Sequence, residues 1–424
     1  MDTSIIAETR RKVEEYKSDI ISVTSNLIGF PTISPPSETR ECAEYIKTYF
    51  EEIGLKTTFY EKKKNKTNLH IKVPGKLGKK LLWLGHLDVV PAGMQSEWAY
   101  KPFEGVVKNG RVYGRGASDM KGSCAAAMVA AKILNEINEN QHATVDFWFT
   151  CDEEVGSPVG TRWLVEEGLL KGDACIIGDS LSRVPEEPWI DAGCKGYMRI
   201  RLKAKGRTAH GSMPFYGDNA IDKLALAIEK AKQIEDLALN FPKDLDALIE
   251  SSTSFLLKDE GLKEKQRKAI KKAFHHPTVS LNLISGGVKV NVVPDSAEAT
   301  FDIRITPGVD PKIVEQKMFT LIESFRDKGV EAETIEVESG YYEKLDTPFA
   351  ESLREAVKLT TGIQPSSKIL LGATDAIPVK KALGIPCLGF GAGIEKLAHA
   401  PNEYVSVEGL LIATKVYSIL PLIY

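Results

Sequence analysis

The sequence of 424 residues is longer than a single hydrophobic core usually supports, so two domains are expected. Its 43% hydrophobic and 27% charged residues are typical of an ordinary globular protein. The formal net charge of -3 gives no reason to expect nucleic acid or an anionic membrane as a partner.

Neither a membrane span nor an export signal is expected. No apolar run approaches the ~20 residues that cross a bilayer, and Met1 to Arg11 lacks the basic and apolar regions of a signal peptide. We therefore predict a cytoplasmic protein. The six cysteines are scattered without a C-x-x-C pair, which argues against a disulfide framework and against a thiolate zinc site.

The first part of the chain alternates helices with strands. Residues 5–28 have the periodicity of one amphipathic helix, and a second helix is predicted to begin at Ser37 and to end at Gly54. Leu81 to Leu84 form a continuous apolar run of the kind that is buried on both faces of a sheet. Further strands are expected at residues 56–61, 69–73, 145–149 and 174–177, with helices at 123–134 and 161–169. This alternation predicts an α/β layered sheet.

The pattern changes near Gly193. Tyr197 to Lys205 alternate between apolar and basic residues, which predicts a sheet with one wet face. A helix, two alternating strands, a helix that begins with Asp310 as N-cap and Pro311 at its first position, and a last strand follow in turn. The order β-α-β-β-α-β is that of a ferredoxin-like unit, here inserted into the first domain.

This second domain carries an extra polar, helix-prone segment at about 235–275. The lysine-rich run 258–272 within it is interleaved with acids, so a solvated helix face is favoured over nucleic-acid contact. From Leu345 the α/β pattern resumes, with a helix at 349–360, a strand at 385–390 and a final helix from Ser406.

Three acids follow the predicted strand 145–149, at Asp152, Glu153 and Glu154. Like charges repel at such a position, and burying them without partners costs several kcal/mol. A positive partner is therefore expected, although a solvated turn is the favoured interpretation of such an acidic cluster taken in isolation.

Two further motifs place polar residues after apolar strands. In extended chain, His86 and Asp88 project to the same face, and an imidazole that binds metal commonly donates its other N–H to a carboxylate. Asp119 lies in a glycine-rich turn just before a helix, where it either binds a ligand or caps that helix.

Asp179 follows the strand 174–177, and His399 follows the glycine-rich stretch 389–393. Each alone is typical of turn chemistry. Together the motifs bring two histidines and several carboxylates to strand ends, where α/β sheets bind ligands. Histidine and carboxylate without thiolate favour a catalytic zinc, cobalt or manganese ion over a structural zinc.

These motifs, in order from about Thr32 to Glu403, resemble those of the acetylornithine deacetylase and succinyl-diaminopimelate desuccinylase family. That family belongs to a superfamily of di-zinc hydrolases with aminoacylases, peptidase T-like tripeptidases and glutamate carboxypeptidases. The resemblance implies an α/β fold with a mixed-sheet zinc-hydrolase catalytic domain at 1–192 and 339–424. The segment 193–338 would be an inserted ferredoxin-like α+β lid and dimerisation domain.

The resemblance also implies two divalent metal ions, zinc before cobalt or manganese. Asp119 would bridge them, His86 and Asp179 would complete one metal site, and Glu154 and His399 the other. Asp88 would hold His86 in place, and Glu153 would be the general base that activates a metal-bound water. Asp152 is given no chemical role, nor is the loop 372–375.

Three residues of the inserted domain match family positions. His210 would reach the substrate carbonyl oxygen from the partner subunit and stabilise the oxyanion, which implies a homodimer formed through the lid domain. Asn291 and Arg304 would contact the substrate. Because Arg304 shares the polar side of its strand with Asp302, a surface ion pair is an alternative to a grip on a substrate carboxylate.

The function predicted is a metal-dependent amidohydrolase that removes an N-acyl group from an amino acid or diamino acid. A carboxypeptidase or dipeptidase of the same superfamily is the alternative, with identical machinery acting on a short peptide. A catalytically silent metal- or ligand-binding protein is disfavoured because Glu153 is present.

Overall fold

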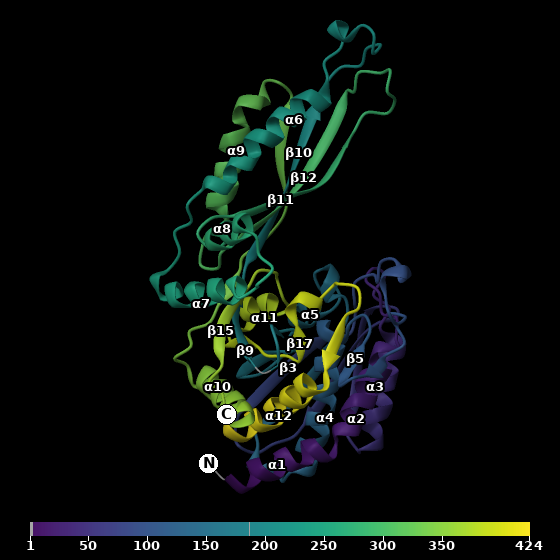
Figure 1. The fold of residues 1–424 in the computed structure, drawn as a ribbon, viewed down its shortest axis with the longest axis vertical. Helices are drawn as coiled ribbons and strands as arrows, with labels where there is room; N and C mark the ends of the chain where they lie inside the picture. Colours follow the sequence, from purple (N-terminus) through teal and green to yellow (C-terminus); the bar gives the residue numbers. More distant parts are fainter. Residues whose placement is uncertain (1–2, 186) are drawn as a thin grey trace. The chain divides into compact units, whose positions relative to one another are not determined.

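In the computed structural model, which describes residues 3–185 and 187–424, the chain forms two units built around different kinds of sheet (Figure 1). The larger unit comprises the residues up to Ala192 together with Glu343–Ser367 and Thr374–Tyr424. The smaller unit comprises Gly193–Tyr342 and Lys368–Ala373. Among the described residues, no helix combines the length and apolar content needed to cross a membrane.

The larger unit contains most of the helices and a large mixed sheet. Its helices are α1 (Thr3–Glu15), α2 (Lys17–Ile28), α3 (Arg40–Glu52), α4 (Gly122–Glu136), α5 (Thr161–Glu166), α10 (Pro348–Thr361), α11 (Ala376–Leu383) and α12 (Val407–Ile423). Its main strands are β1 (Thr57–Lys63), β2 (Lys66–Val73), β3 (Lys80–His86), β6 (Thr144–Thr150), β7 (Ala174–Ile177) and β16 (Cys387–Gly389). The short strands are β4 (Val106–Lys108), β5 (Arg111–Tyr113), β8 (Leu181–Ser182), β17 (Gly393–Ile394) and β18 (Tyr404–Ser406).

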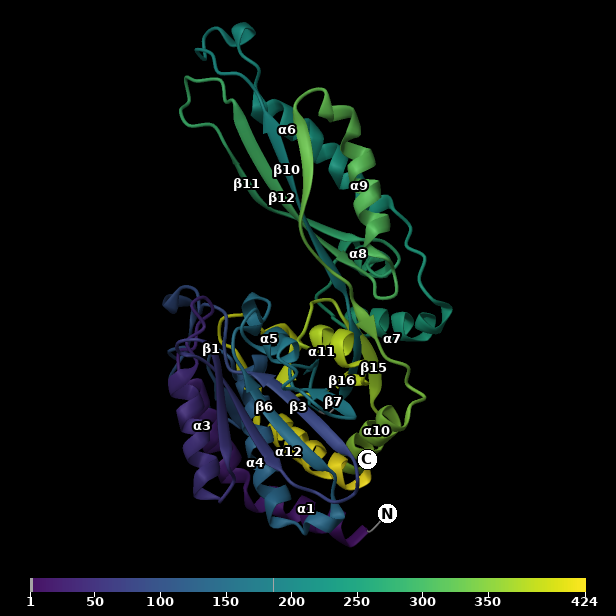
Figure 2. The ribbon, with the colours of Figure 1, turned by 180° about the vertical axis from the view of Figure 1, so that it is seen from behind.

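The sheet has the order β1-β2-β6-β3-β7-β16-β9-β14, in which β14 is Tyr341–Tyr342, and β15 also pairs with β9. Strands β9 (Trp189–Cys194) and β15 (Ser366–Leu370) run across the division between the two units. The central strands β6, β3, β7 and β16 are parallel to one another, whereas β1, β2 and β9 are antiparallel to their neighbours. Figure 2 shows β6, β3 and β7 side by side. The carboxyl ends of the four parallel strands therefore lie at one edge of the sheet.

Aromatic side chains fill the core beneath these strands. The ring of Trp83 on β3 lies 5.3 Å from that of Phe149 on β6 and 5.6 Å from that of Tyr417 on α12. Burying side chains of this size stabilises a fold by about 1.5–3 kcal/mol each. Helix α4 packs against α12, and 12 of its 15 residues are buried, which its small alanines allow.

The predicted helix at 5–28 differs from the structure in one respect. It consists of two helices, α1 and α2, because Tyr16 leaves the helical region at φ -88° and ψ 11°. The Tyr16 hydroxyl donates a hydrogen bond to Glu136 of α4 at 2.5 Å, so a tertiary contact accompanies the break. Amphipathic periodicity alone did not reveal it.

The smaller unit is a four-stranded antiparallel sheet covered by two helices. Its elements are β10 (Gly196–Lys205), α6 (Ala220–Ala231), α7 (Asp246–Leu257), α8 (Glu264–Lys272), β11 (Thr278–Gly286), β12 (Ser296–Ile305), α9 (Pro311–Arg326), β13 (Val330–Glu338) and β14 (Tyr341–Tyr342). The sheet order is β11-β12-β10-β13. Asp310 caps α9 as predicted, since its side chain accepts a hydrogen bond from the Lys312 N–H at 3.0 Å. The α/β class with an inserted ferredoxin-like unit is confirmed.

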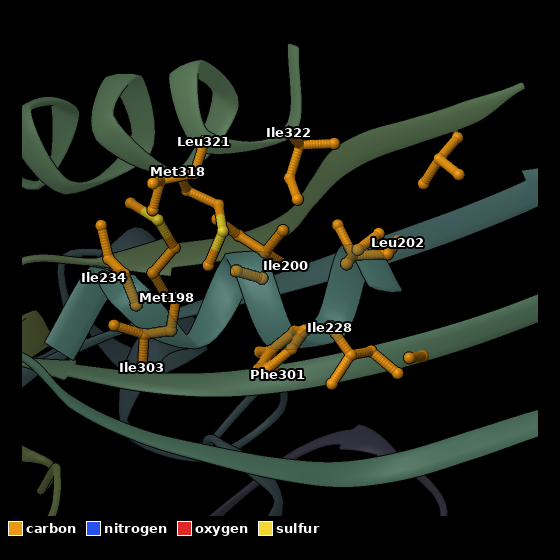
Figure 3. Packing of buried hydrophobic residues seen from close by; sticks show 14 of the residues in the cluster. Met198, Ile200, Leu202, Ile228, Ile234, Phe301, Ile303, Met318, Leu321 and Ile322 are labelled. Atoms are coloured by element: carbon orange, nitrogen blue, oxygen red, sulfur yellow. The ribbon is translucent and has the colours of Figure 1, made fainter. Parts of the chain in front are cut away.

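One face of this sheet forms the core of the smaller unit. Figure 3 shows side chains of β10 and β12 pointing toward those of α6 and α9; among them are Met198, Ile200, Leu202, Ile228, Phe301, Ile303, Met318 and Leu321. The other face is exposed to solvent. Basic residues of β10 form ion pairs there with acids of neighbouring strands, for example with 2.6 Å between Arg199 Nη1 and Glu336 Oε2. The alternation read from the sequence thus corresponds to a sheet with one buried face.

The helical segment at about 235–275 packs on strands that lie beside it in the smaller unit. The Ile369 N–H of β15 donates to the Ser252 hydroxyl of α7 at 2.8 Å. The ammonium of buried Lys195 donates to the carbonyl oxygen of Ala273. Burial, reinforced by the Arg304 guanidinium, lowers the pKa of Lys195 to about 7.

Candidate metal centre

The ends of the parallel strands gather the predicted metal ligands. His86 is the last residue of β3, Glu153 and Glu154 follow β6, and Asp179 follows β7. His399 lies in the chain between β17 and β18. Because the carboxyl ends of parallel strands meet at one edge, side chains from distant parts of the sequence come together there.

Glycines next to two of these residues let the strands approach the core closely. A Cβ at Gly85, the residue before His86, would lie 2.4 Å from the Trp83 ring and 2.5 Å from Met120. A Cβ at Gly178, the residue before Asp179, would lie 2.6 Å from the same ring. The two glycines therefore allow the backbone to lie against the Trp83 ring, and this contact sets the backbone positions of His86 and Asp179.

Asp119 lies at the centre of the cluster. One of its oxygens is 3.1 Å from His86 Nε2, and the other is 3.3 Å from His399 Nε2. His399 Nε2 is also 3.2 Å from Glu154 Oε2. Ligand atoms of His86, Asp119 and Glu154 all lie within 4.8 Å of one another. Asp119 does not cap the following helix, so the ligand interpretation of this residue is favoured over the capping one.

Two carboxylate oxygens in the cluster suit a cation. Oδ1 of Asp179 and Oε1 of Glu154 are buried and accept no hydrogen bond. A buried, unsatisfied carboxylate oxygen is costly unless a positive group balances it. Imidazole nitrogens and carboxylate oxygens are the ligand types of catalytic zinc and related divalent metals, so the residues present fit such an ion.

The electrostatics of the cluster reflect the crowding of charges. Burial raises the pKa of Asp179 to about 7 and also raises that of Glu154. Hydrogen bonds to Asp119 and Glu154 raise the pKa of His399 to about 10. Burial opposes protonation of His86, but its contacts with Asp119 and Asp88 outweigh that effect and hold its pKa well above the usual value. The cluster thus holds four acids and only two imidazoles. Divalent cations would supply the positive charge that balances these acids.

Asp88 connects His86 to the acidic turn. Nδ1 of His86 donates to the backbone oxygen of Asp88 at 2.9 Å, and Nε2 faces Asp119. In a neutral imidazole held this way, the lone pair on Nε2 would be directed toward a cation. The Asp88 carboxylate accepts hydrogen bonds from the N–H groups of Glu153 at 3.0 Å and Glu154 at 3.2 Å, and from the Ser34 hydroxyl. Asp88 therefore orients the predicted ligand His86 through its backbone oxygen and the predicted base Glu153 through its carboxylate.

Glu153 and Glu154 occupy a single 3-10 turn, Glu153–Val155, that begins after Asp152 in the left-handed region at φ 57°. Of the two side chains, only that of Glu154 forms an ion pair with His399. Burial raises the pKa of Glu153 well above its usual value, and the nearby carboxylates of Asp375, Glu154 and Asp179 act in the same direction. A carboxyl group with a raised pKa beside candidate metal ligands is suited to proton transfer.

Comparison with known proteins identifies the family to which this cluster belongs. The family described as Peptidase family M20/M25/M40 matches residues 82–421. The chain belongs to this family. A probable succinyl-diaminopimelate desuccinylase of Staphylococcus aureus (strain Mu50 / ATCC 700699) is 28% identical over 391 residues, 90% of this chain and 93% of the relative.

Two solved structures extend the comparison. The M20 family metallo-carboxypeptidase Sso-CP2 from Sulfolobus solfataricus has a TM-score of 0.81 and 25% identity, and covers 96% of this chain and 99% of its own. The di-peptidase Dug1p from Saccharomyces cerevisiae has a TM-score of 0.80 and 17% identity, and covers 98% of each chain. The predicted family resemblance is confirmed, and so is the prediction of a metal-dependent hydrolase that cleaves amide bonds.

Sequence reasoning missed several residues that support this M20 site. Asp152, which was given no chemical role, is buried, and its carboxylate accepts hydrogen bonds from the N–H groups of Gly160 at 2.9 Å and Val159 at 3.3 Å. Asp375, in the loop left without a role, accepts hydrogen bonds from the hydroxyls of Ser157 and Thr161. Both acids fix the segment that follows Glu153 and Glu154.

Glu403 and Arg115 were also missed as a pair, although Arg115 shortly precedes Asp119 in the chain and Glu403 shortly follows His399. They form a buried ion pair with 2.6 Å between Glu403 Oε2 and Arg115 Nη1. Asp375 and Glu403 each contact a segment more than 200 residues away in the chain, so local pattern carried no signal for these two acids. The sequence signal that could have found Glu403 was its place close to the candidate ligand His399 in the chain.

The three predicted lid residues lie in the smaller unit, at two different places. The segments that carry His210 and Asn291 are neighbours, since the Gly211 N–H donates to the Asn291 oxygen at 2.8 Å and His210 forms a β-bridge with Val292. Arg304 lies near the other end of β12, where its Nε is 2.6 Å from Asp302 Oδ1. The structure therefore brings His210 together with Asn291, and pairs Arg304 with the acid considered for the surface ion pair.

Proposed function

We propose that the chain is a two-metal amidohydrolase that removes an N-acyl group from an amino acid or diamino acid, with zinc as the metal before cobalt or manganese. The observation that carries the proposal is the Asp119 carboxylate, which directs one oxygen toward His86 and the other toward His399 beside Glu154. A cytoplasmic location is proposed as well, because all six cysteines are unpaired thiols.

The predicted division of ligands is retained. Asp119 would serve both metal positions, His86 and Asp179 would belong to one, and Glu154 and His399 to the other. When bound, two divalent ions lower the pKa of a water and polarise the scissile carbonyl. Histidine and carboxylate donors without thiolate favour that catalytic use over a structural one.

Glu153 is proposed as the general base. Asp88 anchors its backbone N–H at 3.0 Å, which fixes where the carboxylate can reach. The raised pKa of Glu153 lets the carboxyl group hold a proton taken from the attacking water and then deliver it to the leaving amine nitrogen. No group of the protein needs to bond covalently to the acyl carbon.

The substrate class is tested with a panel. The S. aureus relative that spans nearly the whole chain is named a succinyl-diaminopimelate desuccinylase, which supports an N-acyl substrate. A carboxypeptidase is the second candidate, because Sso-CP2 has the same fold at 25% identity. With Co²⁺- or Zn²⁺-loaded protein, we expect kcat/KM for N-succinyl-diaminopimelate or another N-acyl amino acid to exceed that for any dipeptide by at least tenfold. Turnover of dipeptides alone would exclude the deacylase and favour the peptidase.

The smaller unit, at about residues 193–338, is proposed as a lid and dimerisation domain. Nδ1 of His210 accepts the Ser212 N–H at 3.2 Å, so a neutral imidazole carries its proton on Nε2 and can donate it to an oxyanion. Large apolar side chains of this unit are exposed, among them Phe215, Leu283, Ile284, Val288 and Val290. Exposed apolar groups in such number favour an interface with a second copy.

The positions of the lid residues support action between two copies. Arg304 follows Ser296 by eight positions along β12, so at ~3.4 Å per residue the two lie about 27 Å apart. Asn291 and His210 lie beyond the Ser296 end. One lid therefore cannot bring both His210 and Arg304 to a single small substrate, which supports action of His210 from a second copy.

Mixing two inactive variants tests this arrangement. His210→Ala and Glu153→Gln are each expected to lack turnover as homodimers. After unfolding and refolding together, half of the dimers are hybrids with one complete site each, so about a quarter of wild-type activity should return. Sedimentation should show a dimer throughout. A monomeric, active wild-type enzyme, or no recovery in hybrids shown to form, would contradict action in trans.

A further inference from the structure

Glu403 and Arg115 lie between the two loops that carry Asp119 and His399. Glu403 is fully buried and Arg115 is 2% exposed. Replacing a buried ion pair by apolar residues is often neutral for stability, so the stability of the fold does not by itself explain this pair. The hydrogen bonds of the Glu403–Arg115 pair show which backbone segments the pair holds in place.

Glu403 binds the backbone of the Asp119 loop. Its Oε1 accepts hydrogen bonds from the N–H groups of Ser118 at 2.8 Å and Asp119 at 3.0 Å, and its Oε2 accepts one from Gly116 at 3.0 Å. The backbone oxygen of Glu403 also accepts the Gly114 N–H at 2.9 Å. The peptide that leads into Asp119 is therefore fixed from the chain segment that follows His399.

Arg115 reaches in the opposite direction. Its Nη2 donates to the carbonyl oxygen of His399 at 3.1 Å, while its Nη1 bonds Glu403. His399 needs such support, because its φ of 62° is a left-handed conformation that costs a non-glycine residue of order 1 kcal/mol. The His399 side chain is 53% exposed, so packing around the imidazole does not hold it.

We propose that Glu403 and Arg115 are positioning residues that lock the two ligand loops into one geometry, so that Asp119 and His399 present their ligand atoms together. Neither residue touches substrate, and neither supplies a ligand atom. The inference rests on the proposed function, since it takes Asp119 and His399 as ligands. It assigns to one buried pair the task of keeping Asp119 Oδ2 and His399 Nε2 3.3 Å apart.

The test compares Glu403→Gln and Arg115→Lys with a matched control, Glu343→Gln. Glu343 is also buried in the larger unit, pairs with Lys380 at 2.8 Å and accepts the Cys387 N–H at 2.9 Å, but contacts none of the ligand loops. Binding of Co²⁺ alone to the metal-free full chain is measured by competition with a chelator and by its visible absorption. The Tm of the metal-free protein, kcat and KM are measured in parallel.

For Glu403→Gln we expect the weaker of the two Co²⁺ equivalents to lose 10–100-fold in affinity, with an altered absorption band. The value of kcat should fall by a similar factor while KM changes less than threefold. Arg115→Lys keeps the charge but cannot span both Glu403 and the His399 carbonyl, so its loss should be smaller. The Tm of the metal-free variants should fall no further than that of Glu343→Gln, whose Co²⁺ affinity should equal that of wild type.

Unchanged Co²⁺ affinity and spectrum in folded Glu403→Gln would overturn the inference, as would losses no larger than those of Glu343→Gln. Should Glu403→Gln fail to fold, wild-type affinity in Arg115→Lys overturns it, and a weakened second equivalent there supports it. His399→Ala separates this result from failure of the proposed function. If His399→Ala binds Co²⁺ as wild type does, the ligand set itself is wrong.

Discussion

Replacing Glu153 by glutamine is expected to lower kcat by about 10²–10⁴-fold while both metal ions still bind. Glutamine keeps the shape of the side chain but cannot take a proton from water. The backbone position of residue 153 is fixed by the Asp88 carboxylate rather than by its own side chain, so the turn should survive. The measurement is steady-state kcat and KM together with metal content by elemental analysis.

The neighbouring acid provides the matched control for this experiment. Glu154→Gln removes a carboxylate that lies 3.2 Å from His399, so we expect it to lose metal as well as activity. Glu153→Gln should therefore lower kcat without loss of metal, whereas Glu154→Gln should lower both kcat and metal content. Wild-type kcat in metal-loaded Glu153→Gln would refute its role as base, and metal loss equal to that of Glu154→Gln would reassign it as a ligand.

The sequence predicted those parts of the site that depend on strand order. His86, Glu154 and Asp179 directly follow apolar runs, and apolar runs followed by polar residues reveal where parallel strands end. Once three strands are parallel and adjacent, their ends must meet, so the grouping of these residues follows from the fold class. The Asp119 loop could be located by its glycines, but the choice between cap and ligand needed the positions of His86 and His399.

The remaining parts depend on contacts that no local pattern encodes. Glu403 acts on a loop 284 to 287 residues away, and Asp375 on one 214 to 218 residues away. The break at Tyr16 likewise accompanies a contact with Glu136 of α4. The pairing of Arg304 with Asp302 needed the side-chain geometry, because alternation places both residues on the wet face without saying whether they touch.

Asp119→Asn is expected to have the broadest effect on the metal centre, with activity reduced at least 10³-fold and both metal affinities weakened. Among the described residues grouped here, only the Asp119 carboxylate contacts both histidines of the cluster. An asparagine keeps one oxygen acceptor but loses the negative charge, and its NH₂ group turns donor hydrogens toward a cation or an imidazole. Co²⁺ titration of the metal-free protein measures the loss at each position.

Asp146→Asn is the control for this substitution. Asp146 is buried on β6 and also lies between two basic side chains, a histidine and a lysine, with His70 at 3.3 Å and Lys80 at 2.5 Å, but it contacts no predicted ligand. We expect this variant to lose stability and to keep two Co²⁺ equivalents. Because a ligand that binds only the folded state raises its stability, chelation should lower the Tm of wild type and of Asp146→Asn but leave that of Asp119→Asn nearly unchanged. A chelator response in Asp119→Asn equal to that of wild type would show that the metals are held elsewhere, and the assignment of Asp119 as the shared ligand would then be wrong.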